Sequence, residues 1–234
     1  MTSVVGRPVE HTPPCPPAAS ALALRRMTPL PISPGPILQF LDVFGIAMFA
    51  ASGAIAAARA RQTFVTAAFF ALVTGVGGGT VRDLLIGAPV FWIVDPWIAL
   101  IVLGAALVIW VTPERWWAGQ GLDWLDAIGL ASYAVFGAAK AYGLGVPPVP
   151  AFLMGVVTAC VGGIIRDVLA GEPSILMRPE LYVTAAALAS ALYVGMRLMG
   201  FQGFAVSLVA AGAGFGLRAV AIRMKLGLPT YRGR

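Results

Sequence analysis

Two motifs of the same form bring charged residues into apolar parts of the sequence. In each motif a glycine pair is followed, after two intervening residues, by an arginine and an aspartate that are neighbours in the sequence. The motifs read Gly78-Gly79-Thr80-Val81-Arg82-Asp83 and Gly162-Gly163-Ile164-Ile165-Arg166-Asp167. A charged residue deep in a membrane span costs from about 2.5 to more than 10 kcal/mol, and such residues usually face a bundle interior or an aqueous path. The chemistry that these residues favour is contact with a polar solute, or ion pairing inside a helical bundle.

The two arginines have two alternative roles. In the first, Arg82 and Arg166 meet the solute; in the second, they form ion pairs with neighbouring carboxylates and hold the local helix geometry. The residue types do not choose between these roles. An aspartyl protease dyad of Asp83 and Asp167 is disfavoured, because a dyad needs one carboxyl protonated and the adjacent arginines tend to keep both ionised. We therefore expect no catalytic residue and no enzyme.

Glycines and threonines occupy the centres of both motifs. The candidates for a pore lining or a helix kink are Thr74, Gly77, Gly78, Gly79 and Thr80 in the first copy, and Thr158, Gly162 and Gly163 in the second. A glycine in mid-helix weakens the helix by about 1 kcal/mol relative to alanine, so the run predicts a break or kink. Unwound backbone in a membrane is tolerated only where protein buries it or a water-filled cavity meets it. The alternative is that the glycines only let helices pack closely.

Three further charged residues belong to the same set. Asp42 and Asp126 occur early in equivalent apolar spans, where they either cap a helix start or pair with the motif arginines. Lys140 has no counterpart, because Ala56 occupies the equivalent position. It either snorkels to the membrane interface or acts as a gating charge or as an electrostatic element at the mouth of the pathway.

The composition identifies the lipid bilayer as the solvent of this chain. Of 234 residues, 59% are hydrophobic and 11% are charged, against roughly 45–50% and about 25% in soluble domains. The net charge of +6 is scattered between apolar spans, which argues against a nucleic-acid-binding face. One histidine, His11, and two cysteines, Cys15 and Cys160, offer no metal-binding spacing, so we expect no resident metal or cofactor. The glycine run also lacks the Gly-Lys-Ser or Gly-Lys-Thr ending of a nucleotide-binding loop.

Seven apolar spans near the length needed to cross a bilayer follow a proline-rich leader. We predict them at 37–58, 63–87, 93–111, 122–143, 148–171, 180–199 and 202–222. Basic residues in short loops fall mostly on one side of these spans, which predicts the amino terminus outside and the carboxyl terminus in the cytoplasm. Gly212 and Gly216 in the last span predict close helix packing, within the protomer or between subunits.

The chain repeats itself at a shift of 84 residues without a gap. Matched pairs include Asp42 with Asp126, Gly53 with Gly137, and Arg82 with Arg166. Equivalent positions are three spans apart, an odd number, so the second copy enters the membrane from the opposite side. Inverted repeats of this kind recur in solute carriers, with the pathway at the repeat interface. The predicted fold is all-α and integral to the membrane, with two inverted three-helix repeats, a seventh helix, and broken second and fifth helices.

The predicted division of the chain follows from these spans. Proline-rich segments without a sustained apolar run cannot bury a core, which predicts disorder before the first span. The segments are a disordered tail at 1–36, a first repeat at 37–120, a second repeat at 121–200, a seventh helix at 201–225 and a cytoplasmic tail at 226–234.

These features closely resemble prokaryotic members of the trimeric intracellular cation channel family. The resemblance rests on the two Gly-Gly-x-x-Arg-Asp centres, the inverted three-span repeats and the seventh span, and it covers about residues 37–225. It implies a homotrimer surrounded by lipid in the cell inner membrane, with one pore per protomer around the kinked second and fifth spans. It also implies conduction of monovalent cations, chiefly potassium, with sodium passing too.

The sequence departs from the family pattern at two places. Val161 stands where Gly77 stands in the first copy, so the second half is expected to bend less, and Lys140 alone represents the positive fourth span that the family links to voltage response. Some bacterial proteins with this pattern are described as transporters of small amino acids, particularly glycine. A glycine secondary transporter is therefore the alternative function, and a non-conducting structural or sensory membrane protein is the third.

Overall fold

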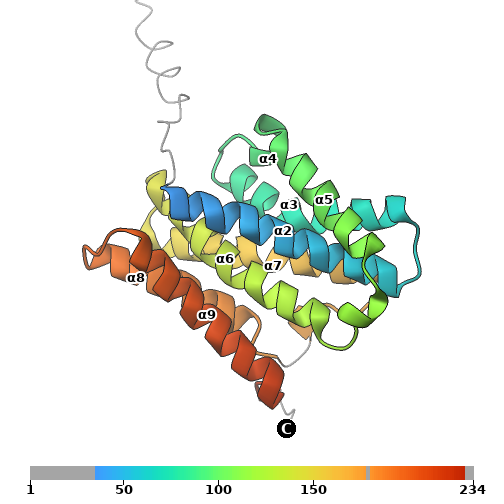
Figure 1. The fold of residues 1–234 in the computed structure, drawn as a ribbon. Coiled ribbons are helices and arrows are strands. Elements are labelled where there is room, and N and C mark those ends of the chain that lie inside the picture. The colour runs from blue at the N-terminus through green and yellow to red at the C-terminus, as the bar shows by residue number, and fades with distance from the viewer. Residues whose placement is uncertain (1–34, 178–179, 230–234) are drawn as a thin grey trace, which may run out of the picture. The chain divides into compact units, whose positions relative to one another are not determined.

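The computed structural model describes residues 35–177 and 180–229. Nearly all of the predicted leader and the last five residues of the predicted cytoplasmic tail lie outside these ranges. Within them the chain forms eight α-helices and two single turns of 3-10 helix, and no strand (Figure 1). The predicted all-α class is confirmed.

Each of the seven predicted apolar spans coincides with one helix. The bounds are α2 Pro36–Arg59, α3 Phe64–Leu85, α5 Trp97–Val111, α6 Gly121–Gly143, α7 Pro148–Ala170, α8 Val183–Leu198 and α9 Phe204–Met224. A short additional helix, α4 Phe91–Val94, lies in the connection between α3 and α5. The 3-10 turns are η1 Glu114–Trp116 and η2 Ile175–Met177.

Four of these helices, α2, α3, α7 and α9, are long and apolar enough to cross a membrane. α5 and α8 are apolar but have only 15 and 16 residues. α6 has 23 residues, and it carries Asp123, Asp126 and Lys140, which lower its mean hydropathy. Length and composition alone therefore identify four crossing helices in the described part of the chain, compared with the seven predicted.

The two sequence copies pack in the same way. α2 packs against α3 and α5, and α6 packs correspondingly against α7 and α8. α2 and α6 also contact each other, α3 crosses α7, and α9 lies along α6 and α8. Figure 1 shows α2 and α6 in the middle of the helical part, with α4 and α5 on one flank and α8 and α9 on the other. The 84-residue repeat in the sequence is thus a repeat of helix contacts.

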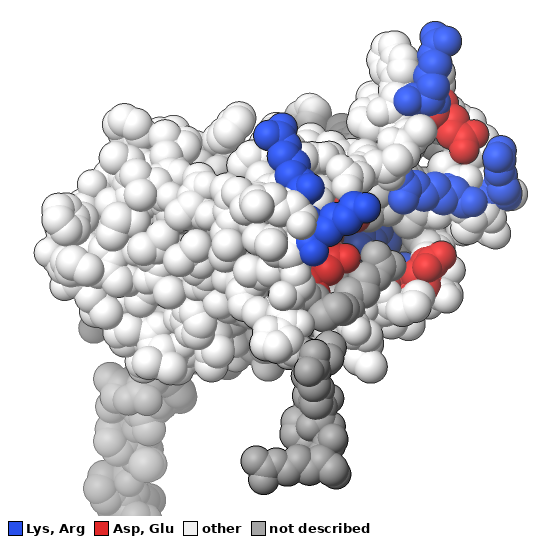
Figure 2. Space-filling model, turned by 90° about the horizontal axis from the view of Figure 1, so that it is seen from below, with Lys and Arg blue, Asp and Glu red and all other residues white. Residues whose placement is uncertain are grey.

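Small residues form much of the core, and large apolar residues cover much of the outside. Ala54 and Ala134 are among many fully buried alanines, and the ring of Phe49 stacks on that of Tyr133 with centroids 5.4 Å apart. Exposed apolar side chains such as Leu107 suit contact with lipid tails. Figure 2 shows charged side chains gathered toward one side of the molecule on a face that is otherwise uncharged. Since lipid is as apolar as leucine, close packing rather than water exclusion holds such helices together.

Glycines at the helix centres allow α3 and α7 to cross at close range. A Cβ atom added to Gly78 would overlap the carbonyl oxygen of Thr158, and one added to Gly162 would overlap the carbonyl oxygen of Thr74. Both helices are nevertheless continuous through these glycines. The predicted break in the second and fifth helices is therefore wrong, because the glycines remove side chains from a contact instead of interrupting the helix. The alternative, a kink at these glycines, stays a prediction.

The glycine of α9 that packs closely against another helix is not one of the two that the sequence predicted. Apart from the backbone of α9 itself, no heavy atom of the described residues lies within 4 Å of a Cβ added to Gly212 or Gly216, whereas one added to Gly214 would lie 2.7 Å from the Cβ of Ala189. Packing of α9 inside the protomer therefore uses Gly214. The alternative, that Gly212 and Gly216 contact another subunit, stays a prediction.

We predict that Gly78→Ala destabilises the protein by forcing α3 away from α7. The added methyl group meets a backbone carbonyl that cannot rotate away, and overpacking of this kind costs about 1–3 kcal/mol. The melting temperature of the purified protein in detergent should fall. Gly104→Ala is the matched control, because Gly104 also lies in a helix but has open space around it, and its melting temperature should stay the same or rise. Equal melting temperatures for Gly78→Ala and the unmodified protein would contradict the close crossing.

Candidate functional site

Both motif arginines are enclosed by protein. The exposed fraction is 0% for Arg82 in α3 and 1% for Arg166 in α7, and the adjacent Asp83 and Asp167 are also buried. Removing such a charge from water costs several kcal/mol, which only good geometry with an anion and further hydrogen bonds recovers. The pairing of the two arginines differs, and this difference decides what each can do.

Arg166 is held by three neighbours. Its Nε and Nη2 donate to Asp167 Oδ1 at 2.9 and 2.8 Å. Its Nη1 donates to Asp126 Oδ1 and, at 3.2 Å, to Ser52 Oγ. The other oxygen of Asp167 accepts the backbone N–H of Ile175 at 2.8 Å. Because all three guanidinium nitrogens donate to protein, this network ties α7 to α2, to α6 and to the segment that follows α7.

Arg82 is held less completely. Its Nε donates to Asp83 Oδ1 at 2.9 Å, but its Nη1 and Nη2 are buried and have no hydrogen-bond partner among the described residues. The rings of Phe136 and Phe91 lie with their centroids 5.1 and 5.8 Å from the guanidinium carbon. A cation–π contact stabilises the charge but accepts no N–H in the manner of an oxygen. Two donor groups are thus left for water or for a polar solute.

Lys140 of α6 completes the cluster around Arg82. Its Nζ donates to Oδ1 and Oδ2 of Asp83 at 2.8 and 2.9 Å, and its side chain is 24% exposed. Asp83 Oδ2 also accepts the backbone N–H of Phe91 at 3.1 Å. Asp42 Oδ1 is buried and has no hydrogen-bond partner among the described residues. The surroundings of Arg82 therefore contain two cations, Arg82 and Lys140, and a carboxylate, Asp83, both of whose oxygens accept hydrogen bonds. They also contain an oxygen of Asp42 that has no partner among the described residues.

Two sequence positions explain the difference between the halves. At the 84-residue shift, Ser52 corresponds to Phe136 and Ala56 corresponds to Lys140. The second-copy arginine finds the Ser52 hydroxyl where the first-copy arginine finds an aromatic ring, and only the first copy has an ammonium group that binds its aspartate. Sequence reasoning missed Ser52 and Phe136. The signal in the sequence is that equivalent positions of the two copies hold different residue types, serine at 52 and phenylalanine at 136.

Asp42 and Asp126 do not cap helix starts. The residues at the cap positions of α2 and α6 are Gly35 and Gln120, and neither makes a side-chain capping hydrogen bond. The capping alternative is therefore wrong. Asp126 pairs instead with Arg166, while Asp42 makes no ion pair among the described residues.

The three motif threonines have different hydrogen-bond partners, and two of them, Thr74 and Thr158, lie at the crossing of α3 and α7. Thr80 Oγ1 donates to the carbonyl four residues earlier at 2.8 Å and accepts Trp92 Nε1–H at 2.9 Å. Thr158 Oγ1 donates to the carbonyl four residues earlier, whereas Thr74 Oγ1 is buried without a partner among the described residues. The hydroxyl of Tyr133, which sequence reasoning also missed, donates to the carbonyl of the residue after Thr74 at 2.9 Å.

The remaining motif glycines face side chains. An added Cβ would lie 2.5 Å from the Phe91 ring at Gly79, 2.6 Å from the Tyr182 hydroxyl at Gly163, and 2.9 Å from Ile165 Cδ1 at Gly77. Each glycine therefore makes room for one specific neighbouring side chain.

A third buried arginine lies outside the repeats. Arg218 of α9 is 1% exposed, and its Nη2 donates to Glu180 Oε2 at 2.7 Å. Its guanidinium carbon lies 5.3 Å from the centroid of the Tyr182 ring. This pair ties α9 to the segment before α8. Sequence reasoning missed it, because Arg218 is a lone charge without a partner in the repeat pattern.

Comparison with known proteins gives this arrangement a family. A family model described as "Glycine transporter" matches the chain twice, at residues 39–114 and 123–198, again 84 residues apart. The UPF0126 inner membrane protein YadS of Escherichia coli (strain K12) is 36% identical over 206 residues, which cover 83% of this chain and 96% of that protein. A UPF0126 membrane protein of Vibrio cholerae is 38% identical over 201 residues, 83% of each chain.

Solved structures also match this chain over most of its length. The structure of the TRIC trimeric intracellular cation channel orthologue from Rhodobacter sphaeroides superposes with a TM-score of 0.76 and 38% identity, covering 81% of this chain and 99% of that one. The chain belongs to the prokaryotic branch of the trimeric intracellular cation (TRIC) channel family. A second TRIC cation channel structure superposes with a TM-score of 0.75 and 28% identity, covering 84% and 98%. The relatives and the solved structures that match this chain are membrane proteins or channels and not enzymes, as the sequence predicted.

We predict that Asp126→Asn destabilises this TRIC-family protein more than Asp42→Asn does. Asp126 is one of two carboxylates that neutralise Arg166, and removing one partner of a buried ion pair costs about 3–5 kcal/mol. Asp42 makes no such pair among the described residues, so it is the matched control in the equivalent position. Thermal unfolding in detergent, followed by the loss of monodisperse protein, measures the difference. Equal losses for the two variants would argue against the asymmetry between the two clusters.

Proposed function

We propose that this protein is a homotrimeric channel for monovalent cations, chiefly potassium with sodium also passing, in the cell inner membrane. The observation that carries the proposal is the similarity to a solved TRIC channel orthologue along almost the whole of that chain. Each protomer has its own pore, at the interface between the two three-helix repeats. No cofactor takes part, because the permeant ion is itself the ligand.

The proposed pore runs past the crossing of α3 and α7. Its lining is formed by the motif residues Thr74, Gly77, Gly78, Gly79, Thr80, Thr158, Gly162 and Gly163. Two features support this location: the hydroxyl of Thr74 and one carboxylate oxygen of Asp42, both of which are buried and have no hydrogen-bond partner among the described residues. Buried polar groups without protein partners are expected where water or an ion reaches them.

Lys140 is proposed as the gating charge. Its ammonium group donates a hydrogen bond to Asp83, which also accepts one from Arg82. The positive charges of Lys140 and Arg82 therefore both lie beside the proposed path. A cation would meet electrostatic repulsion there. Movement of Lys140 away from Asp83 would leave a carboxylate with one cation fewer, and the path would become more favourable for a cation.

The membrane topology is part of the same proposal. We infer seven crossings, with the repeats at 37–120 and 121–200 inverted and the seventh helix at 201–225. The amino terminus lies outside and the carboxyl terminus in the cytoplasm. Support comes from the exposed basic residues at the connection between α2 and α3, Arg59 and Arg61, and at the end of α9, Arg223 and Lys225. Short cytoplasmic loops carry an excess of such residues.

A glycine secondary transporter is the second candidate, and the description of the matching family model favours it. A channel passes ions down their electrochemical gradient without saturating at low concentration. A carrier alternates access and saturates with its substrate. The two functions are therefore separable by transport kinetics.

We predict discrete single-channel currents from the purified protein in planar bilayers under a potassium chloride gradient. The reversal potential should lie close to the potassium equilibrium potential, and replacing potassium by sodium should reduce but not abolish the current. Silent bilayers, together with saturable glycine uptake that shows counterflow in liposomes, would overturn the channel proposal in favour of the carrier. Crosslinking in detergent should give a dominant trimer.

We predict different defects for the two arginine variants Arg82→Gln and Arg166→Gln. Arg166 donates from all three nitrogens to protein, so its loss should lower the yield of folded trimer, with a cost of about 3–5 kcal/mol for the carboxylates left behind. Arg82 has one hydrogen-bonded nitrogen, and Asp83 keeps Lys140, so Arg82→Gln should remain a folded trimer with altered conductance. Gel filtration and bilayer recording of both variants measure this. Normal conductance in folded Arg82→Gln trimers would exclude a pathway role for Arg82.

A further inference from the structure

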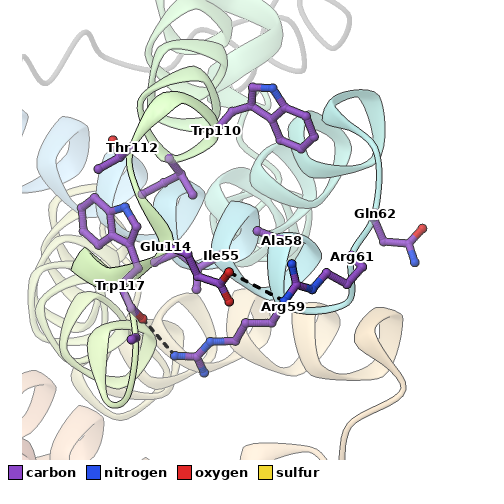
Figure 3. A pocket seen from close by; sticks show the side chains of 11 residues that line it. Ile55, Ala58, Arg59, Arg61, Gln62, Trp110, Thr112, Glu114 and Trp117 are labelled. Atoms are coloured by element: carbon purple, nitrogen blue, oxygen red, sulfur yellow. Dashed lines mark hydrogen bonds and ion pairs between the residues drawn. The ribbon is translucent and has the colours of Figure 1, made fainter.

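A cleft of about 430 Å³ lies at the end of α2 that carries Arg59. Its walls come from the last turns of α2 and α5 and from the segment around η1, and its polar side chains include Arg59, Arg61 and Glu114 (Figure 3). This volume is in the range of about 300–1,000 Å³ that is usual for small-molecule sites. The cluster of Arg82, by contrast, lies with Asp42 near the other end of α2, so the cleft is a separate feature.

The position of the cleft corresponds to a membrane surface. α2 ends at Arg59 and α3 begins at Phe64, and both helices are long and apolar enough to cross a bilayer. Their connection therefore lies where the hydrocarbon ends. Trp110 and Trp117 line the same cleft, and tryptophan is enriched at the level of the lipid headgroups.

The side chains of the cleft carry two positive charges and one negative charge. Arg59 Nη2 donates to the carbonyl oxygens of Trp117 and Gly119 at 3.3 and 2.8 Å, which holds its guanidinium group at the wall of the cleft. Arg61 Nη2 lies 3.7 Å from Glu114 Oε2, and these side chains are 82% and 75% exposed. An ion pair that is so long and so exposed contributes little, about 0–1 kcal/mol. Arg61 and Glu114 can therefore each leave this weak ion pair and bind a more strongly interacting group of a ligand.

An apolar surface adjoins the cleft on the outside of α5. Val108 and Val111 are exposed in the last turn of that helix, and Leu107 is exposed one residue before Val108. A molecule whose polar end occupied the cleft could therefore lay an apolar chain along α5 without leaving the lipid phase. Free inorganic anions cannot use this surface.

We propose that the cleft binds the headgroup of an aminophospholipid of the phosphatidylethanolamine type. Its phosphate lies between Arg59 and Arg61, its ammonium group lies at Glu114, and its acyl chains follow the exposed face of α5. Arginine pairs with phosphate through strong charge-assisted hydrogen bonds. Glu114 supplies the selectivity, because a headgroup without an amine would place a phosphate near this carboxylate and offer it no cation.

Lipid binding to purified, delipidated protein tests the proposal by native mass spectrometry. The unmodified protein should bind phosphatidylethanolamine about tenfold more tightly than phosphatidylglycerol, which corresponds to about 1.4 kcal/mol. Glu114→Gln should remove this preference, and Arg61→Gln should weaken the binding of both lipids. Arg115→Gln is the matched control, because it removes a neighbouring positive charge that does not line the cleft, and it should bind like the unmodified protein.

Three results would overturn the proposal. These are equal affinity of the unmodified protein for the two lipids, an unchanged preference in Glu114→Gln, and displacement of the bound lipid by equimolar inorganic phosphate, which would indicate a free-anion site. Arg59 is left unchanged in these tests, because it also donates to backbone carbonyls and its loss would disturb the fold. The readout is lipid retention, so it stands whether or not the protein conducts ions.

Discussion

A guanidinium group enclosed by membrane helices needs an anion within hydrogen-bond distance, and each repeat supplies one in the next residue of the chain. Asp83 neutralises Arg82, and Asp167 neutralises Arg166. The second oxygen of each aspartate accepts a backbone N–H eight residues later, at Phe91 and Ile175. The same pair thus neutralises a buried charge and fixes the segment that leaves the helix. The rest of the site depends on this constraint, because it sets where both arginines lie.

The close crossing of α3 and α7 brings the two repeats together. Gly78 faces the carbonyl of Thr158, and Gly162 faces the carbonyl of Thr74, so each copy provides both the glycine and the carbonyl. In lipid, helices gain stability from such close backbone approach rather than from excluding water. Continuous helices satisfy the backbone groups of their central turns internally, whereas a break there would expose polar groups to a largely apolar core. The glycines serve packing here, and the polarity of the site comes from side chains.

The two repeats pack in the same way, but the surroundings of Arg82 and Arg166 differ. All three guanidinium nitrogens of Arg166 donate to carboxylates or to Ser52. Phe136 occupies the equivalent place beside Arg82, and the terminal nitrogens of Arg82 have no hydrogen-bond partner among the described residues. Lys140 adds a charge to this half only. One half therefore has the contacts of a structural anchor, and the other has polar groups that still need a partner.

The amino-acid sequence by itself determined the membrane class, the position of every long helix, the 84-residue repeat and the two Arg-Asp pairs. These features depend on composition, on span length and on adjacent residues, all of which are local. Only the tertiary structure decided that Arg166 pairs with Asp126, that Lys140 reaches Asp83, that Arg218 meets Glu180, and that the glycines pack without breaking their helices. Those outcomes depend on the distance and rotation between helices that are about 40 or more residues apart, and no local pattern specifies these quantities.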